Sequence, residues 1–419
     1  MRKHVMIGAG AASLSALKHI RKVGSDDAVV LITMEDQLPY SPMSLPYLIM
    51  GKRKASEIRL ADEQYLEEMN VTFVRGLRVN RIEPDQNRIV YENGESETYD
   101  TLLVATGSEP KIQPKLAAQN VPGFHIMEDF LRLEDLKEKS RVTILGAGFV
   151  GTEIGLALSE KGHRVHIIAP RERILRQYFG PELDDIVVDL FARHGIRVER
   201  NWGEVTRVNQ NNGSCKATFA SGENIETDLL IAATGVRPRV SLLEGSGIET
   251  NQGIVVDRKM RTNIPNIFAA GDVAETANFL TGQEGLSLIW PSAIEQGKVA
   301  GSNMAGQELE YDGWISMNVF NFFGHFAVSI GEAVPAEGDE VLLEKDETKS
   351  SYKRLVCRND QLIGANFFNI DIDAGVIQYL VRNRVDIGPH KELLFEKPKE
   401  VGLWLMHETE KQKTLSLER

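Results

Sequence analysis

A glycine-rich pattern that occurs twice constrains the fold of this chain more than any other feature. Residues 142–155 form an apolar run, a Gly-Ala-Gly turn and the start of a helix, and residues 5–13 repeat the same plan. The first glycine permits the turn, the second lets the backbone approach a pyrophosphate, and the third small residue lets the helix pack close to its strand. These positions are Gly8, Gly10 and Ser13 in the first copy and Gly146, Gly148 and Gly151 in the second. Two copies, each starting a strand–helix–strand pattern, predict two dinucleotide-binding units.

The chain after each copy continues this plan. Buried strands are predicted to end in Ala-Thr-Gly at residues 105–107 and again at 233–235, so the two units are related along their length. Glu35 follows a predicted parallel strand and lies 27 positions after Gly8, near the place where an acid binds an adenosine ribose. Residues 264–272 form a short predicted strand that ends in a Gly-Asp pair.

Composition and charge exclude several classes of protein. With 42% apolar and 26% charged residues over 419 positions, the chain can build real cores and is not disordered. A net charge of −12 and the lack of a basic stripe argue against a nucleic-acid partner, whereas an acidic surface suits solubility or docking to a basic partner. No apolar run approaches the ~20 residues that span a membrane. No signal peptide fits the N-terminal sequence, so we expect a cytoplasmic protein.

The chain contains two cysteines, Cys215 and Cys357, in different predicted domains. No Cys-x-x-Cys redox pair and no Cys-based metal cluster can form within the chain. We therefore expect two ordinary buried or half-buried thiols and no metal site.

The predicted fold is α/β, with two Rossmann-like three-layer dinucleotide-binding domains and a small α+β C-terminal domain. From residue 311 the pattern changes to short strands, with a hairpin at 352–368 and a helix at about 373–384. The predicted domains are residues 1–110 with 240–310, residues 111–239, and residues 311–419.

Three local expectations concern the chain between these units. Three prolines among residues 39–46 predict an irregular loop. Residues 56–69 are predicted to form a surface helix, and residues 110–122 a linker.

In this order the motifs resemble the pyridine nucleotide-disulfide oxidoreductase superfamily, the flavoproteins with two dinucleotide-binding domains. The resemblance covers nearly the whole chain and implies FAD on the first unit and NAD(P) on the second. Glu35 would bind the adenosine ribose, Thr106 and Gly107 would close over the adenosine side, and Asp272 would accept a hydrogen bond from a ribityl hydroxyl. The residues implied for FAD are Gly8, Gly10, Ser13, Glu35, Pro42, Met43, Thr106, Gly107, Gly271 and Asp272. Those implied for NAD(P) are Gly146, Gly148, Gly151, Arg171 and Gly235.

The chain departs from the thiol-dependent members of this superfamily. Met43 stands where coenzyme A disulfide reductases and related NADH oxidases carry a redox cysteine, in the sequence Met-Ser-Leu-Pro-Tyr. A thioether cannot form a thiolate or a recycling sulfenate, which excludes disulfide and peroxide reduction through that position. Sulfide:quinone chemistry is excluded as well, because it needs cysteines.

Residues 290–297, Trp-Pro-Ser-Ala-Ile-Glu-Gln-Gly, are similar to a segment of rubredoxin reductases, oxygenase-coupled ferredoxin reductases and apoptosis-inducing factor. The resemblance places Trp290 beside the flavin and Glu153 near the nicotinamide, as the candidate catalytic residues. Tyr47 replaces a lysine that these relatives hold near the flavin. Gly151 favours NAD, while Arg171 and the lack of an acid at Ala169 leave NADP open.

The resemblance implies an FAD-dependent NAD(P)H:acceptor oxidoreductase, with hydride exchange between nicotinamide and flavin followed by electron transfer to a second redox centre. The second centre must lie on another protein or subunit, which predicts an iron–sulfur partner and a hetero-oligomer or homodimer. Residues 40–47 also resemble the flavin subunits of multi-subunit iron–sulfur oxidoreductases, such as the phenylglyoxylate dehydrogenase and tungsten aldehyde oxidoreductase systems. A free-standing rubredoxin or ferredoxin reductase, an NADH:quinone reductase and a flavoprotein sensor without turnover remain the alternatives. The apolar residues 402–406 are expected to dock onto the domain or a partner.

Overall fold

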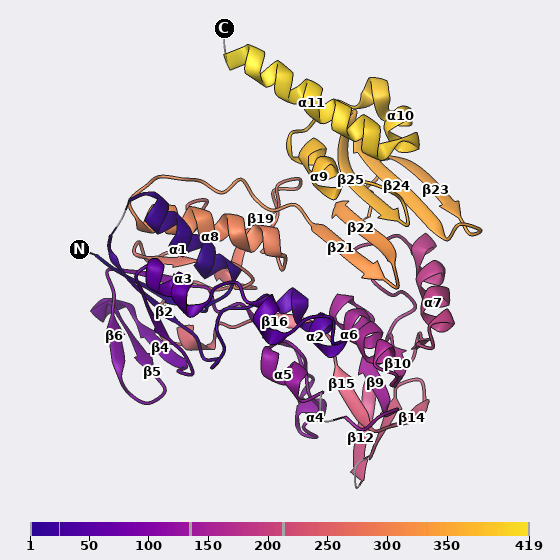
Figure 1. The fold of residues 1–419 in the computed structure, drawn as a ribbon, viewed down its shortest axis with the longest axis horizontal. Coiled ribbons are helices and arrows are strands. Elements are labelled where there is room, and N and C mark those ends of the chain that lie inside the picture. The colour runs from indigo at the N-terminus through magenta and orange to yellow at the C-terminus, as the bar shows by residue number, and fades with distance from the viewer. Residues whose placement is uncertain (1, 25, 134–135, 212–213, 333, 418–419) are drawn as a thin grey trace. The chain divides into compact units, whose positions relative to one another are not determined.

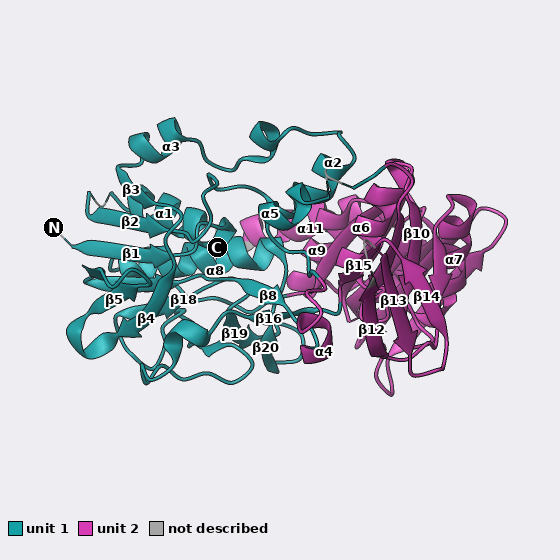
Figure 2. Cartoon of the chain, turned by 90° about the horizontal axis from the view of Figure 1, so that it is seen from below, with its two compact units in different colours: residues 1–113, 122–137, 234–314 teal, residues 114–121, 138–233, 315–419 magenta. Residues whose placement is uncertain are grey.

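The computed structural model describes residues 2–24, 26–133, 136–211, 214–332 and 334–417. They form two compact units, each assembled from segments that are distant in sequence (Figure 2). Unit 1 comprises residues 1–113, 122–137 and 234–314, and unit 2 comprises residues 114–121, 138–233 and 315–419. Most of the predicted second nucleotide-binding domain, residues 114–121 and 138–233, therefore shares one unit with the predicted C-terminal domain.

Unit 1 is built on a five-stranded parallel sheet in the order β18-β7-β1-β2-β3. The strands are Ile267–Ala269, Thr101–Val104, Lys3–Ile7, Ala28–Ile32 and Val71–Val74 in that order. Helices α1 (Ala11–Lys22) and α8 (Trp290–Met304) pack together beside this sheet, and the antiparallel sheet β4-β5-β6 lies on its other side (Figure 1). The smaller strands of unit 1 are β4 Val79–Glu83, β5 Arg88–Tyr91, β6 Ser96–Thr98, β8 Ser108–Pro110, β16 Val236–Pro238, β17 Ile254–Val255, β19 Ala274–Ala277 and β20 Glu284–Leu286.

Two glycines of α8 allow the backbones of α8 and α1 to lie in direct contact. A Cβ at Gly297 would lie 2.1 Å from the Ala12 carbonyl oxygen, and a Cβ at Gly301 would lie 2.3 Å from that of Ala16. Both alanines belong to the helix that follows the first glycine turn. The close packing of α1 and α8 therefore depends on positions without side chains, and it fixes the helix that carries the predicted FAD phosphate site.

Unit 2 contains a four-stranded parallel sheet in the order β11-β10-β9-β15. The strands are Arg197–Glu199, Arg164–Ile168, Arg141–Leu145 and Leu229–Ala232. Helix α6 (Phe149–Glu160) follows β9, and α7 (Asp184–Arg193) follows the loop after β10. A short helix, α4 (Pro114–Ala117), and the sheet β12-β13-β14 complete this half, with β12 Val205–Asn211, β13 Ser214–Phe219 and β14 Asn224–Thr227. The sequence Asn-Asn-Gly at residues 211–213 predicts a hairpin turn, which lies partly outside the described residues.

The second half of unit 2 is a five-stranded antiparallel sheet with three helices beside it (Figure 1). Its strands, in the order β21-β22-β25-β24-β23, are Met317–Phe322, His325–Gly331, Gln361–Phe368, Ser351–Arg358 and Glu340–Asp346. The helices are α9 Ala374–Arg382, α10 Lys391–Glu396 and α11 Pro398–Leu417. Residues 402–406, predicted as a short docking stretch, are part of this 20-residue helix, in which Val401 and Leu405 are buried and Trp404 is 45% exposed.

Buried polar groups connect the two halves of unit 2. The backbone oxygen of Tyr178 accepts hydrogen bonds from Ser329 Oγ at 2.6 Å and from Asn366 Nδ2 at 2.9 Å. The buried guanidinium of Arg354 donates to Asn366 Oδ1 at 3.1 Å through Nε. Since an unpaired polar group in this interior would be costly, these bonds specify how the antiparallel sheet packs on the loop after β10.

The structure confirms the α/β fold class but corrects two local predictions. The proline-rich stretch contains regular structure, because Pro42 begins the 3₁₀ helix η1 (Pro42–Ser44) and Pro46 lies in the first turn of α2 (Leu45–Ile49). Proline has no N–H to lose in a first turn, so it can start a helix that it would break further along.

The helix predicted at 56–69 is wrong over its first half. That half forms a short 3₁₀ turn, η2 (Ala55–Ile58), and Arg59 then pairs with Tyr40 in an antiparallel bridge. The helix itself, α3 (Glu63–Glu68), starts where the Asp62 side chain accepts the Tyr65 N–H at 2.8 Å. The predicted 110–122 linker includes α4.

We expect Gly301→Ala to destabilise unit 1 by about 2 kcal/mol, because the added methyl group would meet the backbone of α1 and overpacking of this kind costs roughly 1–3 kcal/mol. Urea unfolding of the full chain would measure the change. Lys298→Ala, an exposed change on the same helix, is the matched control and should stay within about 0.5 kcal/mol of the wild type. Equal stability of the two variants would contradict the packing described for Gly301.

Candidate nucleotide-binding and redox site

The carboxyl ends of the parallel strands of unit 1 bring most of the predicted FAD residues to one edge of the sheet. Ile7 of β1 is paired with Ile32 of β2 and Val104 of β7, and Val104 is paired with Ala269 of β18. The chain continues from these four strand ends into the predicted residues Gly8, Glu35, Thr106 and Gly271. Ligands of open α/β sheets bind at this edge.

The first glycine turn has a shape that suits a pyrophosphate. Gly8 has φ of +104°, and a Cβ there would lie 2.1 Å from the Ala105 carbonyl oxygen. Gly10 precedes α1 with no side-chain cap, and a Cβ there would meet nothing within 4 Å. The Ser13 hydroxyl is fully buried and has no hydrogen-bond partner among the described residues. Free N–H groups, open space at Gly10 and this unsatisfied hydroxyl fit a bound diphosphate.

The side chain of Glu35 is positioned by a hydrogen bond from Tyr40, a residue that was not among the predicted site residues. The Tyr40 hydroxyl donates to Glu35 Oε2 at 2.6 Å and accepts the Met127 N–H at 2.9 Å. Burial raises the pKa of the Glu35 carboxyl, and the bond from Tyr40 opposes that increase by stabilising the carboxylate. Tyr40 lies in the proline-rich stretch, which was predicted to be an irregular loop, so its contact with Glu35 was not expected.

Asp272 is likewise placed by neighbours that were not predicted. Ser108 Oγ donates to Asp272 Oδ2 at 2.8 Å, and burial raises the pKa of Asp272. The Gly271 N–H donates to Gln296 Oε1 at 2.8 Å. Gln296 is fully buried on α8, so its amide fixes the turn that presents Asp272. In the sequence, the role of Gln296 was indicated only by the Gln-Gly pair at residues 296–297, within the segment that resembles the reductases.

The remaining predicted FAD residues also lie in unit 1. Pro42 and Met43 are exposed on η1, and the Met43 side chain is 56% exposed. Trp290 is the first residue of α8 and is half-buried. Thr106 is half-buried, its hydroxyl donates to the Arg239 carbonyl at 2.8 Å, and Gly107 has φ of +66°.

The second glycine turn, in unit 2, repeats the geometry of the first. Gly146 has φ of +116°, and a Cβ at Gly151 would lie 2.1 Å from the Gly146 carbonyl oxygen. Gly148 precedes α6 without a side-chain cap and has open space at its Cβ position. The loop after β10 closes on this turn, since the Leu175 N–H donates to the Ala147 carbonyl at 2.9 Å.

Glu153 lies on α6, one turn after Gly148. It is half-buried, and burial raises the pKa of its carboxyl to about 7. Arg171 is exposed in the loop after β10, where the position after the strand is the apolar Ala169. Gly235, predicted for the pyridine nucleotide, is placed in unit 1, where its carbonyl accepts the Lys111 N–H at 2.8 Å.

The aromatic residues at the start of the predicted third domain form a packed core. Phe320 and Phe322 are buried, and the Phe320 ring lies 3.6 Å from that of Phe149 at the start of α6. Phe149 in turn stacks on Tyr178 at 3.7 Å. Phe323 stacks on His194 at 3.7 Å. These rings connect the C-terminal sheet with the second glycine turn within unit 2, and Phe320 and Phe322 are not available to a docking protein.

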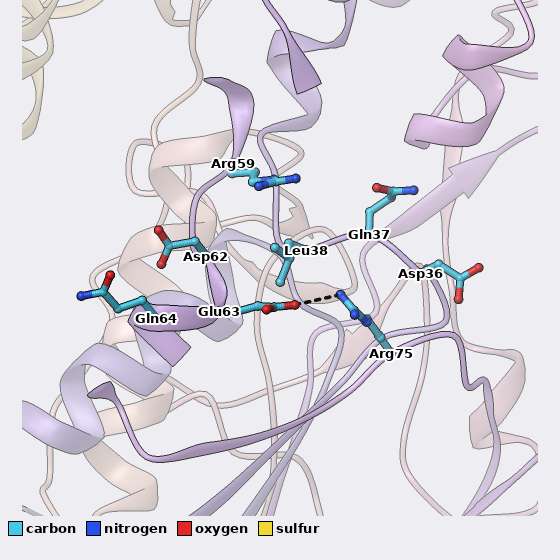
Figure 3. A pocket seen from close by; sticks show the side chains of 8 residues that line it. All are labelled: Asp36, Gln37, Leu38, Arg59, Asp62, Glu63, Gln64 and Arg75. Atoms are coloured by element: carbon cyan, nitrogen blue, oxygen red, sulfur yellow. Dashed lines mark ion pairs between the residues drawn. The ribbon is translucent and has the colours of Figure 1, made fainter. Parts of the chain in front are cut away.

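A surface hollow of about 410 Å³ lies beside the first site (Figure 3). Asp36, which follows Glu35, lines it together with charges of both signs. Figure 3 shows Glu63 and Arg75 facing one another across it, with Glu63 Oε1 3.6 Å from Arg75 Nη1. The other lining residues are Gln37, Leu38, Arg59, Asp62 and Gln64. None of the predicted site residues lines this hollow.

Cys215 and Cys357 are buried and unpaired with each other. Burial raises the pKa of both thiols, to about 11 for Cys357. Among the described residues, no group of three or more His, Cys, Asp or Glu side chains is arranged to hold a metal ion. Within the same residues, no helix has the length and apolarity to cross a membrane.

Two Rossmann-type sheets, each with a glycine turn after its first strand, are the architecture of a flavoprotein reductase that uses FAD and NAD(P). The chain belongs to the pyridine nucleotide-disulphide oxidoreductase family, because the sequence model of this family matches residues 2–297. This membership confirms the resemblance of the two glycine motifs and the cofactor predictions. The protein is therefore an NAD(P)H-dependent flavin oxidoreductase.

One relative extends the match to 97% of the chain. The epsilon subunit of NADH-dependent phenylglyoxylate dehydrogenase from Aromatoleum evansii is 32% identical over 414 residues, covering 97% of this chain and 98% of the relative. An NADH oxidase from Methanocaldococcus jannaschii is 32% identical over 73% of this chain and 71% of its own length. A chain of the covalent putidaredoxin reductase–putidaredoxin complex shares the fold, with a TM-score of 0.85, 20% identity, and coverage of 95% of this chain and 96% of that chain.

We expect Gly10→Val to give folded protein that lacks FAD. The protein itself leaves space for the added side chain, whereas a bound pyrophosphate would occupy that space. Flavin absorbance and circular dichroism of the purified variant would measure both properties. Gly148→Val is the matched change in unit 2 and should stay yellow while losing saturation by NADH. A Gly10→Val protein with full flavin absorbance would contradict the assignment.

We expect the stability of the wild type to fall by about 2 kcal/mol more than that of Glu153→Gln between pH 5 and pH 8. A carboxyl whose pKa is raised holds its proton in the folded state, so its favourable contribution is complete below pH 4.5 and is lost as the pH rises through about 7. Denaturant unfolding at several pH values would measure the difference. The exposed Glu172→Gln is the control, and its pH profile should follow that of the wild type. Parallel profiles for all three proteins would contradict a raised pKa of Glu153.

Proposed function

We propose that this flavoprotein is an electron-transfer subunit or reductase that exchanges hydride with NAD(P) and electrons with an iron–sulfur protein or subunit. The relative from Aromatoleum evansii carries this proposal, because it is named as one subunit of an NADH-dependent dehydrogenase and is matched over 98% of its length. The likeness thus includes the C-terminal sheet and helix α11 as well as the two glycine turns.

The residues of the chain have separate tasks in this proposal. FAD, when bound, supplies hydride exchange with the nicotinamide and electron transfer to the second partner. The Gly8–Gly10 turn and Ser13 bind its diphosphate, Tyr40 orients Glu35 toward a ribose, and Gln296 holds the turn that presents Asp272. Trp290 and Glu153 are proposed to lie beside the flavin and the nicotinamide, respectively.

Glu153 has a defined electrostatic effect if it faces the nicotinamide. Its carboxyl changes charge near pH 7, and the carboxylate favours the cationic oxidised ring over the neutral reduced ring. The affinity for NAD⁺ relative to NADH would therefore increase as the pH rises through about 7. This effect needs no proton transfer between Glu153 and the nucleotide.

Thiol chemistry is not part of the proposal. Met43 replaces the redox cysteine of related enzymes, and the two cysteines present are buried with raised pKa values. For each NADH oxidised, one hydride supplies two electrons, which reduce two one-electron iron–sulfur centres and release one proton. The two cysteines of the chain cannot ligate such a cluster, so these centres belong to the partner.

We propose NAD as the preferred pyridine nucleotide. Gly151 packs directly on Gly146, as expected of the tight turn that is typical of NAD sites. Arg171 is exposed and offers one charge to a 2′-phosphate, whereas Arg173, two positions further on, is paired with Asp184 at 3.0 Å. Flavin reduction rates with NADH and NADPH would distinguish the two, and a tenfold difference corresponds to about 1.4 kcal/mol.

We expect the purified, FAD-loaded chain to reduce an acidic bacterial ferredoxin or its co-purifying subunit in the presence of NADH. The Cys215→Ala/Cys357→Ala variant should retain this activity within about twofold, because buried thiols with high pKa values do not take part in turnover. Stopped-flow absorbance of the iron–sulfur centre would measure the rate. Menadione reduction serves as the control for intact FAD and NAD sites.

Two results would contradict the proposal. Fast NADH:menadione turnover with no reduction of any iron–sulfur protein would favour a quinone reductase. Loss of menadione turnover in the double cysteine variant, with FAD retained, would show that a thiol takes part.

A further inference from the structure

One stretch of unit 1 differs in charge from the rest of this acidic chain. Residues 37–56 contain no aspartate or glutamate, although the chain has 60 of them in 419 positions, which would place about three in any 20 residues. The same stretch contains three consecutive bases, Lys52, Arg53 and Lys54, here called the basic segment. The expectation that the acidic balance would favour a basic partner does not hold for this part of the surface.

The basic segment lies directly against helix α2. Its backbone turns back at the end of the helix, with the N–H groups of Lys52 and Arg53 donating to the Tyr47 carbonyl at 2.9 and 3.3 Å. All residues from Gly51 to Glu57 are exposed, and the Arg53 side chain is 59% exposed. Its contact with Glu57, at 4.0 Å between Nη1 and Oε1, is at the limit of an ion pair and neutralises little charge. Figure 2 shows the connection between α2 and α3 on the outside of unit 1.

The nearby hollow does not extend this positive surface. Arg59 and Arg75 lie there with Asp36, Asp62 and Glu63, so the hollow carries one more negative charge than positive. The basic segment is therefore bounded on its C-terminal side by mixed charge. A partner that recognises it must place its own negative charge over the end of α2.

This position is close to the residues proposed to contact the flavin. Pro42 and Met43 are exposed on η1, directly before α2, and α2 has five residues. A helix of this length spans about 7.5 Å, or about 1.4 turns, and it separates the proposed flavin contact on η1 from the basic segment. The Tyr47 side chain, 44% exposed, lies on the helix between them.

We propose that the basic segment, with Tyr47, is the docking surface for the acidic face of the iron–sulfur electron-transfer partner. This inference rests on the proposed function and adds the charge of the partner and the place where it binds. Opposite charges at the rim of such a contact increase the association rate and make it depend on salt. Because only α2 and the two residues after it separate η1 from the basic segment, a protein docked on this segment would lie beside the proposed flavin contact.

The test uses the FAD-loaded full chain and the variant Lys52→Gln/Arg53→Gln/Lys54→Gln, with an acidic bacterial ferredoxin as the probe. We expect kcat/KM for NADH-dependent ferredoxin reduction to fall about tenfold at low ionic strength and the difference to shrink as salt is raised. The control Arg207→Gln/Lys216→Gln/Lys411→Gln removes the same charge from exposed positions of unit 2 and should match the wild type. Menadione, a neutral acceptor, should be reduced equally by all three proteins.

Each other outcome overturns a distinct claim. Reduction of ferredoxin by the wild type at the same rate and salt dependence as by the basic-segment variant would overturn the docking inference and leave the proposed function intact. No ferredoxin reduction by the wild type, with fast menadione reduction, would overturn the proposed function and the inference with it. An equal loss of ferredoxin reduction in both triple variants would show a general effect of net charge and would overturn the docking inference. Charge-dependent binding to phosphatidylglycerol vesicles, without any effect on ferredoxin, would assign the basic segment to a lipid surface instead.

Discussion

The backbone contact between α1 and α8 is the constraint on which the first site depends. Gly297 and Gly301 allow α8 to lie against the carbonyl groups of Ala12 and Ala16, on the helix that follows the first glycine turn. The same helix α8 carries Gln296, whose amide holds the turn before Asp272, and begins at Trp290. One close packing therefore positions the predicted diphosphate, ribityl and flavin contacts together, even though these residues are separated by more than 250 positions in the sequence.

The sequence predicted the parts of the structure that depend on local pattern. Glycine turns, buried parallel strands and the hairpin at Asn359–Asp360 have short-range signals, and both of these turn residues adopt positive φ as such a turn requires. Helix α11 was missed because only two of its residues in the predicted apolar stretch are buried, so its apolar pattern is weak. The supports of the site were also missed. Tyr40 reaches Glu35 only after the chain has folded back, and Ser108 meets Asp272 across 164 positions.

Unit 2 shows how the second glycine turn and the C-terminal sheet share one interior. The rings of Phe149 and Phe320 are in contact, and the Tyr178 carbonyl accepts hydrogen bonds from two strands of the sheet. The predicted boundary at residue 311 therefore separates segments by sequence pattern, whereas packing joins the third segment to the second. Phe320 and Phe322, at the start of the predicted third domain, contribute to this interior.

The glycines of the two turns are of two kinds, those that the folded backbone requires and those that only a bound nucleotide would require. A Cβ added at Gly8 or Gly151 would lie 2.1 Å from a backbone oxygen, so the polypeptide itself requires glycine there, whereas a Cβ at Gly10 or Gly148 would meet nothing within 4 Å. A descendant of this protein that no longer used one nucleotide would be free to change the second kind while keeping the first. The pattern of retained and replaced glycines in a homologous sequence would then record which of its two nucleotides it still binds.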